Sequence, residues 1–223
     1  MPLVKTKIAC GVVAGPVFVG RFTLLGASRA GYDWQRHAVS SLAAGRKGWA
    51  QRANFMLVGG LYCVAARSLP QSSRRAVGPT MVPALMFAAG TGLIGSGLFV
   101  TDPVAGFPPE EHGAGASRSV ANVAPTRGGA LHNLCAIPIF FGIPVAALLS
   151  AGSAVRWREY RWAGYCVGSA LGMAGAFALF GAAFCGAPTL APYGGLFQRL
   201  SIATGLGWLS ALSMRAFRSA PNS

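Results

Sequence analysis

Six long apolar runs constrain the fold of this sequence more than any other feature. They extend over residues 8–26, 53–69, 78–100, 130–150, 163–185 and 197–217. Each is close to the length of about 20 helical residues that crosses the roughly 30 Å hydrocarbon core of a bilayer. The runs therefore predict an all-α fold, a polytopic transmembrane bundle of six helices. It forms a single domain over residues 1–223, with a polar first loop and a long third loop.

The composition supports a membrane location and argues against nucleic-acid binding. Hydrophobic residues make up 53% of the chain and charged residues 11%, whereas soluble domains carry about a quarter charged residues. The net charge of +14 comes mostly from Lys and Arg in short segments between the apolar runs, without interleaved stacking aromatics. We therefore expect anionic membrane lipids as partners, and no nucleic acid.

The cysteines and the first apolar run narrow the possibilities further. The five cysteines are scattered singly and form no C-x-x-C pair, so we expect no disulfide framework, no thiolate metal site and no cofactor. The run 8–26 follows Lys5 and Lys7, but it is longer than a signal-peptide core and lacks a small-x-small cleavage site, which predicts a retained helix. Lys and Arg are slightly more numerous on the side of the two ends of the chain. This bias predicts a multi-pass protein of the cell membrane with both termini in the cytoplasm.

Glycines recur at three- and four-residue spacing in two of the runs. Gly168, Gly172 and Gly175 do so in one, and the segment GTGLIGSG, residues 90–97, does so in another. Small residues at such spacing let helix backbones approach closely, so both stretches are predicted to be packing surfaces. The pairs Pro138/Pro144 and Pro79/Pro83 are predicted to kink their helices or to lie near helix ends, because proline has no amide N–H to donate.

The polar residues that could carry chemistry fall on one side of the predicted membrane. With six spans, the segments 27–52, 101–129 and 186–196 share that side. They and the adjoining helix ends hold all three histidines and four of the five acids, within the set Asp33, His37, Ser40, Ser41, Asp102, Glu110, Glu111, His112, His132, Tyr193, Gln198 and Arg199. This clustering favours a polar site at one level of the bundle.

The first loop contains a possible base and nucleophile. Trp34 and Trp49 suit the membrane interface. His37, Ser40 and Ser41 are three and four residues apart and share one side if the segment is helical, and a His–Ser pair can act as base and nucleophile. However, the loop lacks the strand and G-x-S-x-G elbow of serine hydrolases. The alternative is that these serines cap or dock a re-entrant helix.

Asp102 lies at the end of the run 78–100 and is followed at once by a proline, which stops a helix. A carboxylate at a helix C-terminus meets the negative end of the macrodipole, and ionisable groups at membrane depth are functional by default. Apolar surroundings would keep this acid protonated near neutrality, whereas a salt bridge to Arg199 or Arg127 would keep it ionised. His132, one turn into the fourth run, could pair with Asp102 or make an ordinary interhelical hydrogen bond.

Four segments resemble one family of membrane proteins. HAVSSLAAGRKGWAQRANF, GSGLFVTDPVAGFP, GGALHNLCAIPIF and GLFQRLSIATGLGW are similar to the proteins grouped as domain of unknown function family 998. The resemblance covers nearly the whole chain. It implies a six-helix bundle and a recurring polar set, His37, Ser40, Asp102, His132, Gln198 and Arg199. It implies no activity.

The first functional hypothesis is a membrane-embedded enzyme that acts on a hydrophobic isoprenoid substrate. The reaction is proton-initiated, class II-like terpene cyclisation, by analogy with the small membrane-bound terpene cyclases. Aromatic faces at several helix levels could stabilise the migrating cation. Asp102 is the expected general acid. The expected catalytic residues are Asp102, His132, His37 and Asp33, and the expected substrate-binding residues are Arg199, Gln198, Tyr193, Phe99, Trp34 and Ser40.

Two other functions stay open. The second is a non-enzymatic lipid-binding or scaffolding bundle in which Asp102, His132 and Arg199 form a buried polar lock. The third is a zinc-dependent membrane lipid hydrolase in which His37, His112 and His132 hold the metal and Asp102 is the activating acid, although no H-x-x-x-H pair supports it. Replacing Asp102 with Asn separates the first two, because an enzyme loses turnover and a lock loses thermal stability. The oligomeric state is left open.

Overall fold

The computed structural model describes residues 2–103, 105–108 and 126–220, and these residues form helices joined by loops and turns. The long helices are α1 (Pro2–Ser28), α2 (Trp49–Ser68), α4 (Met81–Leu98), α5 (Arg127–Ile137), α6 (Ile143–Arg156), α7 (Tyr160–Phe184) and α8 (Gly194–Ser219). Between them lie the short turns η1 (Ser40–Ala43), η2 (Leu69–Gln71), α3 (Arg74–Val77), η5 (Pro138–Gly142, a π-helical turn) and η6 (Ala191–Tyr193). The described residues include no strand, and the predicted all-α class is confirmed.

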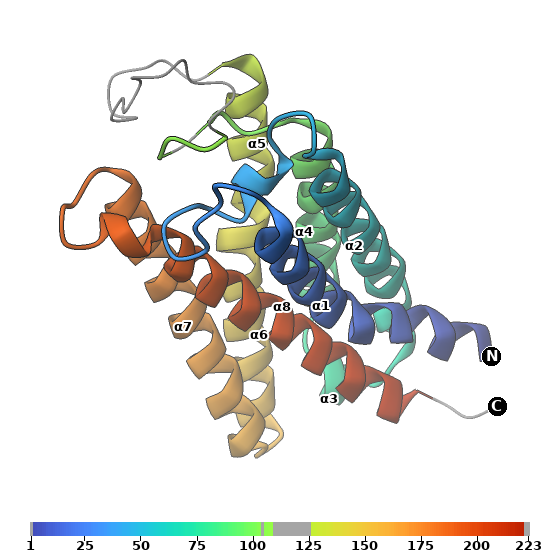
Figure 1. The fold of residues 1–223 in the computed structure, drawn as a ribbon. Coiled ribbons are helices and arrows are strands. Elements are labelled where there is room, and N and C mark those ends of the chain that lie inside the picture. Colours follow the sequence, from blue (N-terminus) through green and yellow to red (C-terminus); the bar gives the residue numbers. More distant parts are fainter. Residues whose placement is uncertain (1, 104, 109–125, 221–223) are drawn as a thin grey trace.

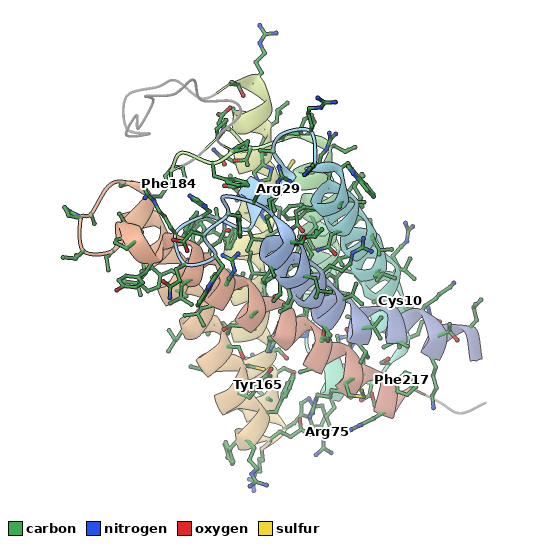
Figure 2. The ribbon with its side chains drawn as sticks, in the orientation of Figure 1. Cys10, Arg29, Arg75, Tyr165, Phe184 and Phe217 are labelled. Atoms are coloured by element: carbon green, nitrogen blue, oxygen red, sulfur yellow. The ribbon has the colours of Figure 1, made fainter. Side chains whose placement is uncertain are left out.

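The long helices stand side by side in a ring (Figure 1). The order is α1, α2, α4, the continuous rod α5–η5–α6, α7 and α8, and the ring closes where α8 contacts α1. Successive rods alternate in direction. The loops 29–48, 185–193 and the described parts of 99–126 therefore share one end of the bundle, the loop face. The turns 69–80 and 157–159 and both ends of the chain share the other, the terminal face. Figure 2 shows Arg29 toward the loop face and Arg75 toward the terminal face.

Several of these helices suit a bilayer. Four helical segments are long and apolar enough to cross a membrane: Leu3–Ser28, Met81–Leu98, Arg127–Arg156 and Tyr160–Phe184. Many large apolar side chains on the outside of the ring are exposed, such as Leu171 of α7 at 66%. Apolar surface of this extent belongs in contact with lipid. The chain is a multi-pass membrane protein by these features.

Two helix ends differ from the predicted runs in ways that affect the site. α4 ends at Leu98, because Phe99 has an extended backbone conformation, so Asp102 lies four residues beyond the helix. The fourth rod begins at Arg127, where Thr126 caps it by accepting a hydrogen bond from Gly129 N. Inside that rod the distortion predicted for proline is the π-helical turn η5.

Glycine spacing identifies a packing surface on α4 but not on α7. A Cβ atom on Gly92 of α4 would lie 2.4 Å from the Cys135 carbonyl oxygen, so α5 approaches too closely for any larger residue. On α7, a Cβ atom on Gly168 or Gly175 would meet nothing within 4 Å, and one on Gly172 would make only ordinary contact at 3.5 Å. The prediction of tight packing on α7 is therefore wrong. Spacing shows which residues share a helix face, but not whether that face meets protein or lipid.

α1 and α8 make a close contact through Gly11 and Gly15. The Ser210 hydroxyl of α8 donates to the Gly11 carbonyl oxygen at 3.1 Å and accepts from the Gly15 amide at 3.3 Å. It thus inserts into the hydrogen-bond ladder of α1, one residue before Pro16, which has no amide N–H. A Cβ atom on Gly15 would lie 2.8 Å from the Leu206 carbonyl oxygen. This contact holds the first and last helices of the ring together.

Candidate functional site

The first loop, residues 29–48, folds back onto the loop face and is held there by Arg199 in α8. One terminal nitrogen of Arg199 donates to the carbonyl oxygens of Trp34 and His37, at 2.6 and 3.1 Å. The other donates to the Tyr32 hydroxyl oxygen, and the guanidinium also lies over the Tyr32 ring, 5.4 Å from its centroid. Burial raises the pKa of Tyr32, and the charge of Arg199 opposes this effect. Arg199 therefore acts as a clamp on the loop.

The same loop closes the N-terminus of α8. The amides of Gly195 and Leu196 donate to the carbonyl oxygens of Arg36 and Gln35, at 3.1 and 2.9 Å. The first amides of a helix have no partner within the helix, so these carbonyls satisfy groups that otherwise need water. The negative ends of the carbonyl dipoles also face the positive end of the α8 macrodipole. The loop is thus a cap for α8 as well as a cover for the bundle.

Gln198 adds a second anchor next to Arg199. It is 5% exposed, and its Oε1 accepts a hydrogen bond from Val39 N at 2.6 Å. Ser40 and Ser41 follow directly, and they begin the short turn η1 rather than the expected re-entrant helix. The Q-R pair of the family resemblance therefore fixes the conformation of the first loop, from residues far away in the chain.

His37 is buried inside this loop, at 8% exposed. Its Nδ1 accepts a hydrogen bond from Asp33 N at 2.9 Å, so the neutral ring carries its proton on Nε2. Burial lowers the pKa of His37, and the charges of Arg36 and Arg199 lower it further, while a backbone carbonyl offsets part of the effect. Within the described part of the chain His37 makes no hydrogen bond with Ser40. It supports the fold of the loop as a neutral ring.

Phe107, which follows α4, packs against the first loop, and the sequence patterns did not identify it. It is 1% exposed, and its ring lies 5.2 Å from the His37 ring and 5.1 Å from the Tyr32 ring, between centroids. The Arg29 guanidinium lies over it, 5.4 Å from the centroid. The signal that could have found it is a lone aromatic residue in a stretch of Gly and Pro, VAGFPP.

A small cavity lies in the centre of the ring, next to the first loop. Its volume is about 30 Å³, room for about two water molecules, because one water needs roughly 10–15 Å³. Every rod except α7 contributes to its wall. The wall consists of four polar, three aromatic and five aliphatic residues: Ser40, Ser96, His132, Gln198, Phe18, Phe55, Phe140, Leu93, Ala136, Ile139, Ile202 and Leu206.

The polar side of this cavity includes three members of the recurring polar set, Ser40, His132 and Gln198, and adds Ser96. The His132 Nδ1 lies 2.9 Å from the Phe99 carbonyl oxygen. Because a carbonyl can only accept, Nδ1 carries the proton, and Nε2 of the neutral ring is an acceptor. The buried Ser96 hydroxyl has no hydrogen-bond partner among the described residues. Such a group costs about 1–3 kcal/mol of stability, so a polar ligand atom or water at this point is stabilising.

Asp102 does not line this cavity. It caps the start of α5, where Oδ2 accepts from Thr126 N at 3.0 Å and Oδ1 accepts from the Thr126 hydroxyl at 2.5 Å. The carboxylate therefore faces the positive N-terminus of α5 rather than the negative C-terminus of α4, and the predicted unfavourable placement is wrong. Within the described residues it forms neither the salt bridge considered with Arg199 nor a hydrogen bond with His132. The three residues of the predicted polar lock therefore make separate contacts: Asp102 caps α5, His132 contacts the end of α4, and Arg199 holds the first loop.

The other predicted site residues lie toward the surface of the loop face. Asp33 Oδ1 accepts from Gln35 N at 2.9 Å, which is an Asx turn. Trp34 and Tyr193 are 51% and 45% exposed, as suits side chains at a membrane interface. The cavity therefore gathers only part of the predicted site. Glu110, Glu111 and His112 lie outside the described residues.

The described part of the chain offers no metal centre. Among its residues no three His, Cys, Asp or Glu side chains lie close enough together to hold a metal ion. The zinc-dependent hydrolase hypothesis depends on His112, which lies outside that part. The hypothesis stays a prediction without support from the geometry.

Comparison with known proteins gives one family match. The model of the family described as "Protein of unknown function (DUF998)" matches residues 12–215. No curated protein and no solved structure matches the chain. The matched region begins inside α1 and ends inside α8, so it includes the first loop, the connection between α4 and α5, and the residues around the central cavity.

Proposed function

Since the chain belongs to the DUF998 family of proteins of unknown function, we propose its role from its own geometry: it is a non-enzymatic, lipid-binding membrane protein. All six rods of the ring cross the cell membrane, and both termini lie in the cytoplasm. The ligand is a hydrophobic molecule of isoprenoid or similar chain type. Its polar end group, a hydroxyl or carbonyl, enters the central cavity.

The observation that carries this proposal is the mixture of groups around the central cavity. Protein interiors contain few voids as large as a water molecule, and this one adjoins the unpartnered Ser96 hydroxyl. A ligand hydroxyl can accept from Ser96 and donate to the acceptor nitrogen of the His132 ring, while Phe18 and Phe55 line the cavity beside its first carbon atoms. A few convergent polar groups in a mainly apolar wall are typical of ligand sites. The volume fits an end group rather than a whole chain.

The hydrocarbon chain of the ligand needs an opening toward the bilayer, and Phe140 provides the best place for it. Phe140 forms part of the cavity wall and stacks on Phe177 of α7, with centroids 4.1 Å apart and planes at 15°. It lies in the π-helical turn η5, a kind of irregularity frequent at functional sites. α7 lines none of the cavity, so separation of this ring pair opens the interior without moving the other rods.

Terpene cyclisation with Asp102 as the general acid stays a separate prediction. A general acid has to be protonated and within reach of its substrate. Both oxygens of Asp102 accept hydrogen bonds from Thr126, and Asp102 is not part of the cavity wall. Lipid binding requires neither condition, and for this reason the geometry supports it better.

Photo-crosslinking tests the proposal. Protein in liposomes is exposed to farnesol carrying a photoactivatable diazirine, and competition by unlabelled farnesol or hexadecanol is measured. Ala136→Phe places a ring in the cavity wall, whereas Ala130→Phe places the same ring on the exposed side of α5. We expect competed labelling of the wild type and of Ala130→Phe, and its loss in Ala136→Phe. Gel filtration shows whether each variant is folded.

A smaller substitution tests the same site with less risk of misfolding. Ser96→Ala removes one hydroxyl and creates almost no cavity, and we expect it to weaken competition by unlabelled farnesol about tenfold. Labelling that unlabelled farnesol does not reduce, or that persists unchanged in a folded Ala136→Phe, means that the probe binds elsewhere and that the proposal is wrong. Preference for hexadecanol over farnesol keeps the site but changes the chain type.

Chemical labelling of Cys185 tests the proposed orientation. Two basic residues of the loop face, Arg29 and Arg199, are used inside the protein, since Arg29 donates to the Leu42 and Ala44 carbonyl oxygens. The terminal face keeps the larger basic surface, which the positive-inside rule places in the cytoplasm. Cys185 is an exposed free thiol on the loop face. A membrane-impermeant maleimide should label it in intact cells but not label Cys185→Ser. Labelling only after lysis reverses the orientation.

A further inference from the structure

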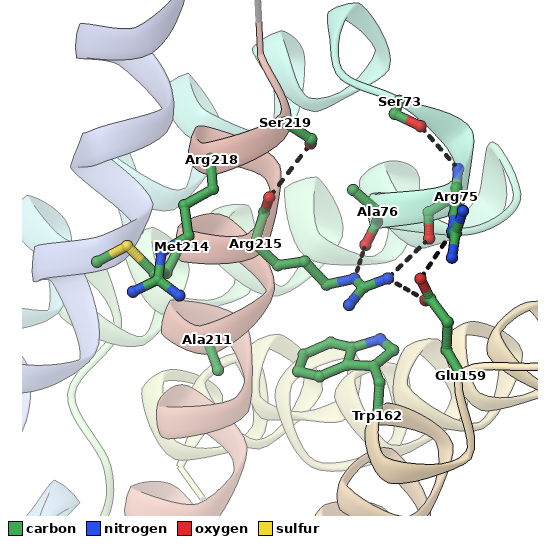
Figure 3. Close-up of a pocket in the computed structure, with 10 residues that line it drawn as sticks. All are labelled: Ser73, Arg75, Ala76, Glu159, Trp162, Ala211, Met214, Arg215, Arg218 and Ser219. Atoms are coloured by element: carbon green, nitrogen blue, oxygen red, sulfur yellow. Dashed lines mark hydrogen bonds and ion pairs between the residues drawn. The ribbon is translucent and has the colours of Figure 1, made fainter.

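A large open pocket lies on the terminal face, at the opposite end of the bundle from the central cavity. Its volume is about 600 Å³, and it is formed where α3, the start of α7 and the end of α8 meet (Figure 3). Four charged residues line it: Arg75, Glu159, Arg215 and Arg218. Three guanidinium groups against one carboxylate leave two positive charges in the pocket. The rest of the wall includes Ser73, Ser219 and Trp162.

Existing contacts fix two of the three arginines in place. The Arg75 Nε donates to Glu159 Oε1 at 2.8 Å, and Arg215 forms an ion pair with the other oxygen of the same carboxylate. Arg215 Nε also donates to the Ala76 carbonyl oxygen at 3.0 Å, and its guanidinium lies over the Trp162 ring, 5.1 Å from the centroid. One carboxylate shared by two guanidinium groups leaves several of their N–H donors unused.

Arg218 is different, because it has no hydrogen bond or ion pair among the described residues. Its charge is not needed to hold the helices together. A guanidinium group binds phosphate through paired N–H donors, and arginine is the residue most suited to this geometry. Arg218 is exposed where it lines the pocket, so its N–H donors are available to an anion that enters there.

The surroundings of the pocket place it at the level of lipid headgroups. Trp157 and Tyr160, at the turn between α6 and α7, are 52% and 65% exposed, which is typical of aromatic side chains at the membrane interface. The Arg75 guanidinium lies over the Trp157 ring at 5.9 Å. Basic pockets between transmembrane helices at this depth bind anionic headgroups.

We propose that this pocket binds the phosphate of an anionic phospholipid headgroup. The unused donors of Arg75 and Arg215 bind the phosphate oxygens, and Glu159 holds these two side chains in position. The Arg218 guanidinium, which lies beside Met214 in Figure 3, turns toward the phosphate when the headgroup binds. The two net positive charges of the pocket favour phosphatidylglycerol over a zwitterionic lipid such as phosphatidylcholine. This site is independent of the central cavity and of the ligand proposed for it.

Native mass spectrometry of the full chain in detergent, with either lipid added, tests the proposal. Arg218→Gln removes the uncommitted guanidinium, and we expect it to weaken phosphatidylglycerol binding about tenfold. Arg156→Gln is the matched control, because it removes the same charge from the end of α6 on the same face but outside the pocket wall. It should leave the affinity within about twofold. Thermal unfolding confirms that both variants are folded.

The outcomes decide between sources of the phosphate. Equal binding of both lipids, or equal losses in Arg218→Gln and Arg156→Gln, means that only general surface charge is involved and overturns the proposal. Displacement of phosphatidylglycerol by millimolar inorganic phosphate assigns the pocket to a soluble phosphate compound and also overturns it. Selective loss in Arg218→Gln without displacement by inorganic phosphate supports a lipid headgroup.

Discussion

Replacing Asp102 with Asn tests whether this acid anchors a loop or performs chemistry. In the structure both oxygens of the carboxylate accept hydrogen bonds from Thr126, at the positive end of α5. Asn keeps one acceptor oxygen but loses the charge. The lost interaction with the helix dipole is worth about 0.3–1 kcal/mol, and the change from a charge-assisted to a neutral hydrogen bond about 1 kcal/mol more. We therefore expect Asp102→Asn to lower the free energy of unfolding by about 1–2 kcal/mol.

This loss is large enough to measure as a shift in melting temperature. For a chain of this size, 1 kcal/mol corresponds to about 2–4 °C, so Asp102→Asn should lower Tm by roughly 2–8 °C. Tryptophan fluorescence during heating, at a fixed detergent concentration, gives the value. Asp33→Asn is the matched control on the same face. Its side chain accepts from the Gln35 amide in an exposed Asx turn, and Asn makes such turns equally well, so its Tm should stay within about 1 °C.

A double-mutant cycle assigns the loss to the contact itself. Asp102→Ala and Thr126→Ala should each destabilise the protein, and the double variant should be less destabilised than the sum by about 1 kcal/mol, because both single changes remove the same hydrogen bond. An unchanged or raised Tm in Asp102→Asn contradicts this reasoning. Removal of a catalytic group from a strained site often has that effect, so the enzymatic prediction would regain support.

Three further changes test the packing and the first loop. Gly15→Val should lower Tm by several degrees in the same fluorescence assay, because its side chain meets the α8 backbone, whereas Gly20→Val meets nothing within 4 Å on the same helix and should leave Tm unchanged. Acidification should destabilise the protein below about pH 6.5, because the pKa of His37 is lower in the folded state than its ordinary value of 6.5 and the unfolded chain binds the proton first. The Tm of the wild type should therefore fall between pH 7.5 and pH 5.5, and that of His37→Gln should fall less. Arg199→Lys keeps the charge but cannot reach the Trp34 and His37 carbonyls and Tyr32 together, so limited proteolysis should cut the 29–48 loop faster than in the wild type.

The helix positions and the segregation of polar residues could be read from the sequence, because both follow from apolar run length and from the alternation of sides. The role of Asp102 could not. A shift of two residues in the end of α4 changed which helix terminus it faces, and helix ends are the least determined part of such a prediction. Its partner Thr126 is 24 residues further along the chain, and no periodic pattern in the sequence between them predicts that the two residues meet.

The composition of the central cavity was also only partly predictable. Ser40, His132 and Gln198 were identified as polar residues at one level, but their sequence positions do not tell which of them meet. Ser96 was not identified, because a serine in an apolar helix has no distinguishing pattern until the packing leaves its hydroxyl without a partner. Similarly, the glycines of α7 have the spacing of a packing surface and yet face outward.

The most direct measurement of the central claim is the position at which the farnesol probe attaches. After crosslinking in liposomes, the protein is digested and the modified peptides are identified by mass spectrometry. We expect attachment near the cavity wall, in the peptides around Ser96, His132 and Gln198, and its loss in Ala136→Phe. Attachment confined to the outward side of α7, unchanged by that substitution, would show that the interior of the ring binds no lipid.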